Sequence, residues 1–110
     1  MGVDGGLPTP EEWGVKPSVR LDENREAIRA AVERRRMTNP RVFGSVLRGE
    51  DKEDSDLDIL VDALPGASLL DLCGLEIDLE ALLGVRVEVL TSRSLSKHFR
   101  DRVVAEAQPI

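Results

Sequence analysis

Residues 41–62 read RVFGSVLRGEDKEDSDLDILVD and contain two predicted strands joined by a turn and a polar loop. In residues 56–62, Leu57, Ile59 and Val61 alternate with Asp56, Asp58, Leu60 and Asp62, which is the two-residue period of a strand with one buried and one partly polar face. Residues 41–43 are a shorter predicted strand that ends at Gly44-Ser45, followed by a short helical turn from Ser45 to Arg48. The stretch therefore predicts a sheet with a partly polar face.

Helical patterns lie on both sides of this stretch. A helix is predicted over residues 22–37, because Asp22 is a favourable N-cap residue and Thr38-Asn39-Pro40 would end it. A second helix is predicted over residues 68–83, with Ser68 as its N-cap and a glycine placed for a left-handed C-terminal cap. The buried stripe of this second helix is expected to be Leu72, Leu75, Leu79 and Leu82.

The remaining residues complete one α/β domain. Valine recurs at every second position in residues 85–90, which predicts a third strand with Glu88 on its other face. A last helix is expected over residues 96–107. The expected order is αβαβαβα, a small mixed sheet of three or slightly more strands packed with helices. Residues 1–20, rich in glycine and proline, are expected to be a flexible N-terminal arm, and residues 21–110 the folded domain.

Composition restricts the classes of function. The chain has 110 residues, a net charge of −6 and a pI near 4.8, whereas a protein that binds a nucleic-acid backbone needs a cationic surface. Aromatic residues make up only 3%, which argues against base-stacking platforms. No apolar run is long enough to span a bilayer, and no signal peptide is recognisable. The single cysteine, Cys73, suits a reducing compartment and is expected to be a small core residue, so a cytoplasmic protein is predicted.

Gly44-Ser45 is the first candidate binding element. A turn at the end of a strand and the start of a helical turn leaves backbone amides unpaired, and such amides bind phosphate well. Glycine lets the backbone approach a phosphate closely, and the serine hydroxyl can donate one more hydrogen bond. Taken alone, a glycine-serine pair is weak evidence, because it occurs far more often in ordinary turns.

Asp56 and Asp58 are the second element. Two carboxylates on the same face of a strand repel each other unless a cation lies between them. Two Mg²⁺ ions, sharing oxygen ligands with a triphosphate, would relieve this repulsion. Glu88 is the third element, because it would join the aspartates if the third strand lay beside the second, either as a metal ligand or as a base. The alternative for all three carboxylates is a solvated strand face.

The spacing of these elements is the pattern G-S-x10-D-x-D, from Gly44-Ser45 to Asp56-Leu57-Asp58. With it the chain resembles the nucleotidyltransferase superfamily that includes DNA polymerase β. It is most similar to the smallest members, the MNT-type (minimal nucleotidyltransferase) antitoxins of the HEPN/MNT toxin–antitoxin systems. The resemblance covers about residues 21–110 and rests on residues 41–49, 55–62, 68–72, 82–91 and 100–104.

The resemblance implies a Mg²⁺-dependent protein adenylyltransferase with ATP as substrate. By resemblance, Gly44, Ser45 and Arg48 would contact the triphosphate, while Asp56 and Asp58 would bind metal. Glu88 stands where many relatives carry aspartate, so its role as base or metal ligand stays open. The MNT antitoxins transfer AMP to a tyrosine of a HEPN-domain ribonuclease toxin and silence it, which implies a hetero-oligomer with such a toxin.

Two other functions remain open at the level of the sequence. An antitoxin could inhibit its toxin by contact alone, with weak or absent catalysis. A transferase acting on a small molecule is the other alternative, but such enzymes usually carry an added domain that holds the acceptor. The complete set of Ser45, Asp56 and Asp58 favours catalysis, because paired carboxylates serve no packing purpose.

Overall fold

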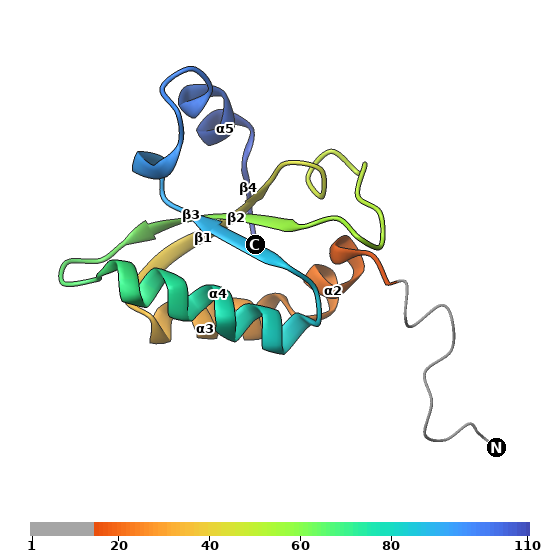
Figure 1. The fold of residues 1–110 in the computed structure, drawn as a ribbon, viewed down its shortest axis with the longest axis horizontal. Helices are drawn as coiled ribbons and strands as arrows, with labels where there is room; N and C mark the ends of the chain where they lie inside the picture. Colours follow the sequence, from red (N-terminus) through yellow and green to blue (C-terminus); the bar gives the residue numbers. More distant parts are fainter. Residues whose placement is uncertain (1–14) are drawn as a thin grey trace.

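The computed structural model describes residues 15–110, and its centre is a four-stranded mixed sheet (Figure 1). The strand order is β3-β2-β1-β4, in which β1 is antiparallel to both of its neighbours and β2 is parallel to β3. The strands are β1 (Met37–Phe43), β2 (Leu57–Ala63), β3 (Val87–Leu90) and β4 (Gln108–Pro109). The expected mixed sheet is thus confirmed, with the third strand beside the second.

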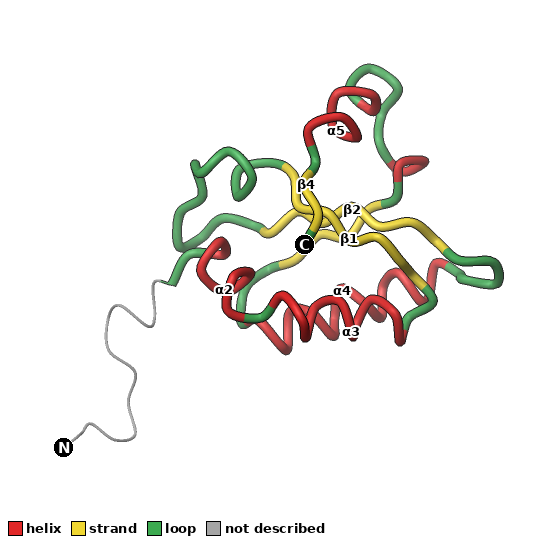
Figure 2. Tube along the Cα trace, turned by 180° about the vertical axis from the view of Figure 1, so that it is seen from behind, coloured by secondary structure: helices red, strands yellow, loops and turns green. Residues whose placement is uncertain are grey.

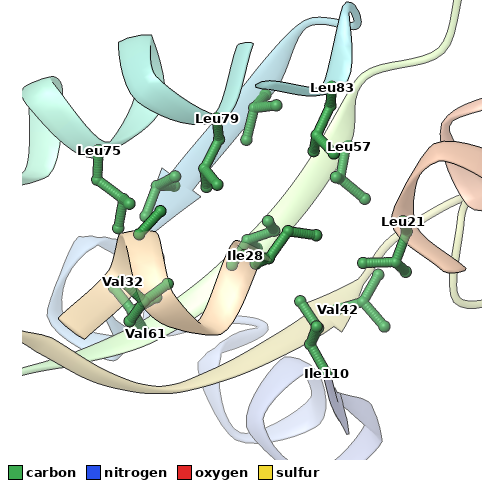
Figure 3. Packing of buried hydrophobic residues seen from close by; sticks show 14 of the residues in the cluster. Leu21, Ile28, Val32, Val42, Leu57, Val61, Leu75, Leu79, Leu83 and Ile110 are labelled. Carbon is green, nitrogen blue, oxygen red and sulfur yellow. The ribbon is translucent and has the colours of Figure 1, made fainter. Parts of the chain in front are cut away.

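Two helices, α3 (Arg25–Arg34) and α4 (Leu69–Leu83), cover one face of the sheet, and α5 (Arg100–Glu106) stands over the other (Figures 1 and 2). The main core lies between α3, α4 and the sheet, where side chains from both helices meet those of the strands (Figure 3). A smaller core under α5 contains Leu60, Leu95 and Ala107. The open remainder of the α5 face is therefore available for a site.

The caps of α4 follow the sequence prediction, but its buried stripe differs by one residue. The Ser68 hydroxyl and the Asp71 carboxylate form a reciprocal capping box, and Gly84 adopts the left-handed conformation at φ 70°. The buried leucines are Leu75, Leu79 and Leu83, whereas Leu82 is 42% exposed. Cys73 is also exposed, so its expected place in the core is wrong. Because α4 is apolar on several faces, the pattern alone did not determine which stripe is buried.

The N-terminal helix begins earlier and ends earlier than expected. Two helices replace it, α2 (Pro17–Glu23) and α3, with a break at Asn24. Proline at the first position of α2 starts that helix, because its missing N–H would be unpaired there in any case. The last four residues of the expected arm are therefore helical, whereas its residues 1–14 lie outside the described part of the chain.

The first strand is longer than predicted, because Arg36 rather than Thr38-Asn39-Pro40 ends the helical region. Arg36 adopts a left-handed φ of 59° directly after α3. β1 then begins at Met37. It tolerates Pro40 because the hydrogen-bonded ladder with β2 shifts register between Thr38 and Arg41, where Asn39 has a positive φ of 55°.

The C-terminal region also departs from the prediction. The last helix covers only Arg100–Glu106 instead of 96–107, and a short 3-10 helix, η1, occupies Ser92–Ser94. The chain then returns to pair with β1 as β4, a two-residue strand too short to be recognised in the sequence (Figure 2). Within the described residues, no helix has the length and apolar character that crossing a membrane requires.

The outer edge of the sheet is closed by two glutamates of α4. The backbone amides of Val87 and Val89, on edge strand β3, donate hydrogen bonds of 3.1 and 2.8 Å to the carboxylates of Glu80 and Glu76. An edge strand otherwise presents free amides to any passing strand. These bonds fix β3, and with it Glu88, against α4.

Candidate active site

The carboxylates predicted from the sequence lie on the sheet face opposite α3 and α4. Leu57 and Ile59 of β2 are fully buried against the helices, so the alternate positions Asp56 and Asp58 belong to the other face. In the parallel pairing of β2 with β3, Asp58 is the register partner of Glu88. The structure therefore brings these two carboxylates onto adjacent strands, as the sequence prediction required.

Gly44 and Asp58 are in direct contact. β1 pairs with β2 so that Phe43 lies opposite Asp58, and Gly44 follows at a φ of 77°. A Cβ atom at position 44 would collide with the Oδ2 atom of Asp58. Only glycine therefore allows the turn after β1 and the carboxylate of β2 to occupy this space together.

The turn after β1 is a hydrogen-bonded helical turn with free amides at its start. The Arg48 amide donates to the Gly44 carbonyl at 3.2 Å, and the Glu50 amide donates to the Ser45 carbonyl at 2.9 Å. Within residues 15–110, the amides of Ser45, Val46 and Leu47 donate no hydrogen bond. Unpaired amides at the start of a helical turn are a favourable setting for a phosphate group.

The setting of Asp58 favours a cation. Partial burial, followed by the negative charges of Glu88 and Asp56, raises the pKa of the Asp58 carboxyl from 3.8 to about 6, against a smaller lowering by Arg48. A carboxylate that is half-desolvated and faces two like charges is stabilised by a positive ion. The charge distribution thus fits the divalent cation expected from the sequence.

Asp56 lies next to an arginine that the sequence prediction did not include. The Nε atom of Arg86 lies 3.0 Å from the Oδ1 atom of Asp56, and the same guanidinium donates a hydrogen bond of 3.1 Å to the Asp54 carbonyl. Arg86 precedes Glu88 by two residues, so it lies on the same face of the strand, beside Asp56. That alternation was the signal in the sequence that could have identified it.

The three carboxylates do not converge in one tight cluster. Within residues 15–110, no three side chains of His, Cys, Asp or Glu are close enough together to hold a metal ion. Asp58 and Glu88 are register neighbours, while Asp56 is paired with Arg86. A cation bound by all three carboxylates would require Asp56 to exchange this arginine for the ion.

Arg48, at the end of the turn, lies on the rim of the site. Its Nε atom donates to Glu50 at 2.9 Å, and this hydrogen bond raises the pKa of the exposed Arg48 guanidinium. Its charge also acts on Asp58, whose pKa it lowers. Arg48 thus contributes positive charge beside the turn and Asp58, although its side chain points to Glu50.

The loop between the turn and β2, predicted as a polar loop, is anchored by Asp51. Asp51 is only 5% exposed, and its carboxylate accepts a hydrogen bond of 2.9 Å from the backbone amide of Ser18 at the start of α2. A carboxylate at the start of a helix pairs with a free amide there. The interaction ties the ten residues between Ser45 and Asp56 to the helical layer.

Comparisons with known proteins agree with this geometry. Residues 25–110 match the nucleotidyltransferase domain family. The protein adenylyltransferase MntA of Thermococcus cleftensis is 52% identical over 65 residues, which are 59% of this chain and 66% of that protein. A proposed protein adenylyltransferase of Methanocaldococcus jannaschii is 50% identical over 66 residues, which are 60% of this chain and 71% of that protein.

Solved structures share the same architecture. A structure described as a proposed minimal nucleotidyltransferase superposes with a TM-score of 0.76 at 45% identity, and the match covers 84% of this chain and 95% of that one. A toxin-antitoxin crystal structure with AMP-PNP gives a TM-score of 0.62 at 20% identity over 84% of this chain and 71% of that one. At that identity the second match supports the fold alone.

Proposed function

The chain belongs to the nucleotidyltransferase domain family, and from this premise we propose that it is an antitoxin that transfers AMP from ATP to a tyrosine of a HEPN-domain ribonuclease toxin. Its class as a nucleotidyltransferase agrees with the prediction from the sequence. The nucleotide, the metal, the acceptor and the partner are the parts that we propose. The two proteins would form a hetero-oligomer in which the modified toxin is inactive.

The observation that carries the proposal is the contact between Gly44 and Asp58. It brings the turn, whose Ser45, Val46 and Leu47 amides have no hydrogen-bond acceptor among residues 15–110, directly against a carboxylate whose surroundings favour a cation. A nucleoside triphosphate with its divalent ion has both an anionic and a cationic part, and it requires both kinds of partner side by side. A protein that inhibited its toxin by contact alone would need neither.

The proposed roles are binding of the triphosphate by the turn and binding of the metal by the carboxylates. Gly44 and Ser45 hold phosphate oxygens, with Arg48 adding positive charge at the rim. Asp56, Asp58 and Glu88 would hold Mg²⁺, with two ions expected, and the metal would supply positive charge to the triphosphate and to the leaving pyrophosphate. The tyrosine oxygen forms a bond to the α-phosphorus, the bond from that phosphorus to the bridging oxygen breaks, and pyrophosphate leaves. Glu88 either accepts the tyrosine proton or serves only as a metal ligand, in which case the proton passes to water.

The acceptor lies on another protein. The chain contains no tyrosine, so it cannot modify itself on that residue. Its net charge of −6 argues against nucleic acid as the acceptor. A phenol has a pKa near 10, well below that of an aliphatic hydroxyl, so tyrosine loses its proton more easily than serine or threonine.

The proposal is tested by incubating the protein with labelled ATP, Mg²⁺ and the product of the neighbouring gene. We expect label on the partner with the native protein and none with the double variant Asp56→Asn, Asp58→Asn. The double variant should remain folded in a thermal melt, because neither side chain is part of the core. Transfer by the folded double variant would show that the site is assigned to the wrong residues.

The separate roles of Ser45 and Glu88 are tested by binding. Ser45→Ala should weaken ATP binding more than Glu88→Gln does, since the hydroxyl is proposed to touch phosphate in the ground state. A base acts mainly on the attacking hydroxyl during the reaction. The reverse order in isothermal titration would overturn these two assignments.

A further inference from the structure

A cavity of about 290 Å³ lies next to the phosphate-binding turn, between the end of β1 and α5. Phe43 and Gly44 line its sheet side, and Phe99 and Val103 line its helix side. Gly44 belongs both to this cavity and to the turn that contacts Asp58. A ligand with its phosphates on the turn would therefore have the rest of its structure beside or within this cavity.

The lining of the cavity suits a flat aromatic ring. The chain has only two phenylalanines, and both line this one cavity. Phe43 also packs against the small core under α5, whereas Phe99 is 47% exposed. A half-exposed phenylalanine at the mouth of a cavity offers a free aromatic face, and a single ring is sufficient to stack one base.

The rim of the cavity is charged, and its charges suit the edge of a heterocycle. Arg102 and Glu106 lie on α5 one turn apart, with 3.4 Å between the Arg102 Nε and Glu106 Oε1 atoms. Together they supply hydrogen-bond donors and acceptors at the outer end of an otherwise apolar space. The edge of a purine carries both donors and acceptors, whereas the ring edge of a tyrosine side chain has only the hydroxyl that must react.

We propose that this cavity receives the purine base of the nucleoside triphosphate, with Phe99 as the stacking surface. The inference rests on the proposed function and adds to it the residues that hold the nucleoside end of the substrate. α5 is then part of the substrate-binding site, although the sequence signals of that site all lie in the strands and the turn (Figure 1). The nearby Arg48, which also lines the cavity, lies between the two ends of the ligand.

The test compares two probes by isothermal titration in the presence of Mg²⁺: AMP-PNP, which carries the base, and inorganic tripolyphosphate, which does not. Phe99→Ala should weaken AMP-PNP binding by about 5- to 100-fold, as expected when one stacked base loses its aromatic partner. Tripolyphosphate binding should be unchanged. Phe99→Tyr, which keeps the ring, should bind AMP-PNP like the native protein. Val104→Ala is the matched control, because Val104 is 40% exposed on α5, the helix that Phe99 precedes, and does not line the cavity.

Other outcomes overturn the inference. Unchanged AMP-PNP binding by Phe99→Ala would place the base elsewhere, and if transfer to the partner then fell, the cavity would belong to the acceptor. An equal loss for both probes would indicate general damage to the site. A native protein that binds neither probe would instead contradict the proposed function itself, so the two failures can be distinguished.

Discussion

The guanidinium of Arg86 lies 3.0 Å from a carboxylate oxygen of Asp56, where it occupies the position of a counter-ion for one of the expected metal ligands. The Arg86 side chain is 73% exposed and the Asp56 side chain 50% exposed, so water screens the ion pair, which is weak and exchangeable. A metal ion that uses Asp56 has to compete with this arginine. The pair therefore makes metal affinity dependent on Arg86.

Arg86→Gln should tighten binding of Mn²⁺, used as a probe for Mg²⁺, by about 1.4- to fivefold, the range that corresponds to an exposed ion pair of roughly 0.2–1 kcal/mol. The measurement is a titration followed by electron paramagnetic resonance in the absence of nucleotide. Arg93→Gln is the matched control for the loss of one positive charge, because Arg93 is an exposed arginine of η1. Weaker Mn²⁺ binding by Arg86→Gln would mean that the arginine supports the metal site instead of competing with it.

Gly44→Ala should abolish most of the transfer activity, by about 100-fold or more, because the added Cβ would push Asp58 out of place. Gly49→Ala separates this effect from backbone strain. Gly49 has a similar positive φ of 70°, but a Cβ there meets no atom within 4 Å. We expect the Gly49 variant to lose some stability in a thermal melt yet keep its activity. Equal losses of activity in both variants would show that strain, and not the contact with Asp58, is responsible.

The raised pKa of Asp58 makes the stability of the metal-free protein depend on pH. The pKa is about 6 in the folded protein against 3.8 for an unperturbed carboxyl, so between these values the folded state holds a proton that the unfolded state has lost. The unfavourable contribution of Asp58 is therefore fully present above pH 6 and disappears as the pH falls toward 4. In urea unfolding, Asp58→Asn should be more stable than the native protein at pH 7.5, and the difference should shrink at pH 5. A difference independent of pH would contradict the assigned pKa.

Asp51→Ala should lower the free energy of unfolding by about 1–2 kcal/mol, because it removes a buried carboxylate that pairs with the start of a helix. Glu53→Ala is the control in the same loop, since Glu53 is exposed, and a change within about 0.5 kcal/mol is expected there. Denaturant titration with EDTA present checks both. Equal effects would mean that the Asp51 hydrogen bond contributes nothing to the anchoring of the loop.

Strand β2 and the capped helix α4 were predictable because their signals are local. The alternation in residues 56–62 and the Ser68 and Gly84 caps need only neighbouring residues, and β2 and α4 formed as expected. Their placement in the sheet also brought Asp58 beside Glu88. These elements depend little on the rest of the chain.

The missed features depend on contacts distant in the sequence. Asp51 belongs to the predicted polar loop, but it is buried and accepts a hydrogen bond from Ser18 of α2, 33 residues earlier. β4 has two residues and forms only because the chain returns to β1. The Arg86–Asp56 pair requires the parallel register of β2 and β3, which the sequence suggests but does not specify. Long-range pairing, rather than local propensity, decided each of these.

Peptide mass spectrometry on the protein co-expressed with its HEPN-type partner tests the central claim most directly. We predict a mass increment of AMP on a tyrosine of the partner that requires Mg²⁺ and is lost with Asp56→Asn. A partner that carries no modification and is nonetheless fully inhibited would contradict the account, because inhibition would then arise from contact alone.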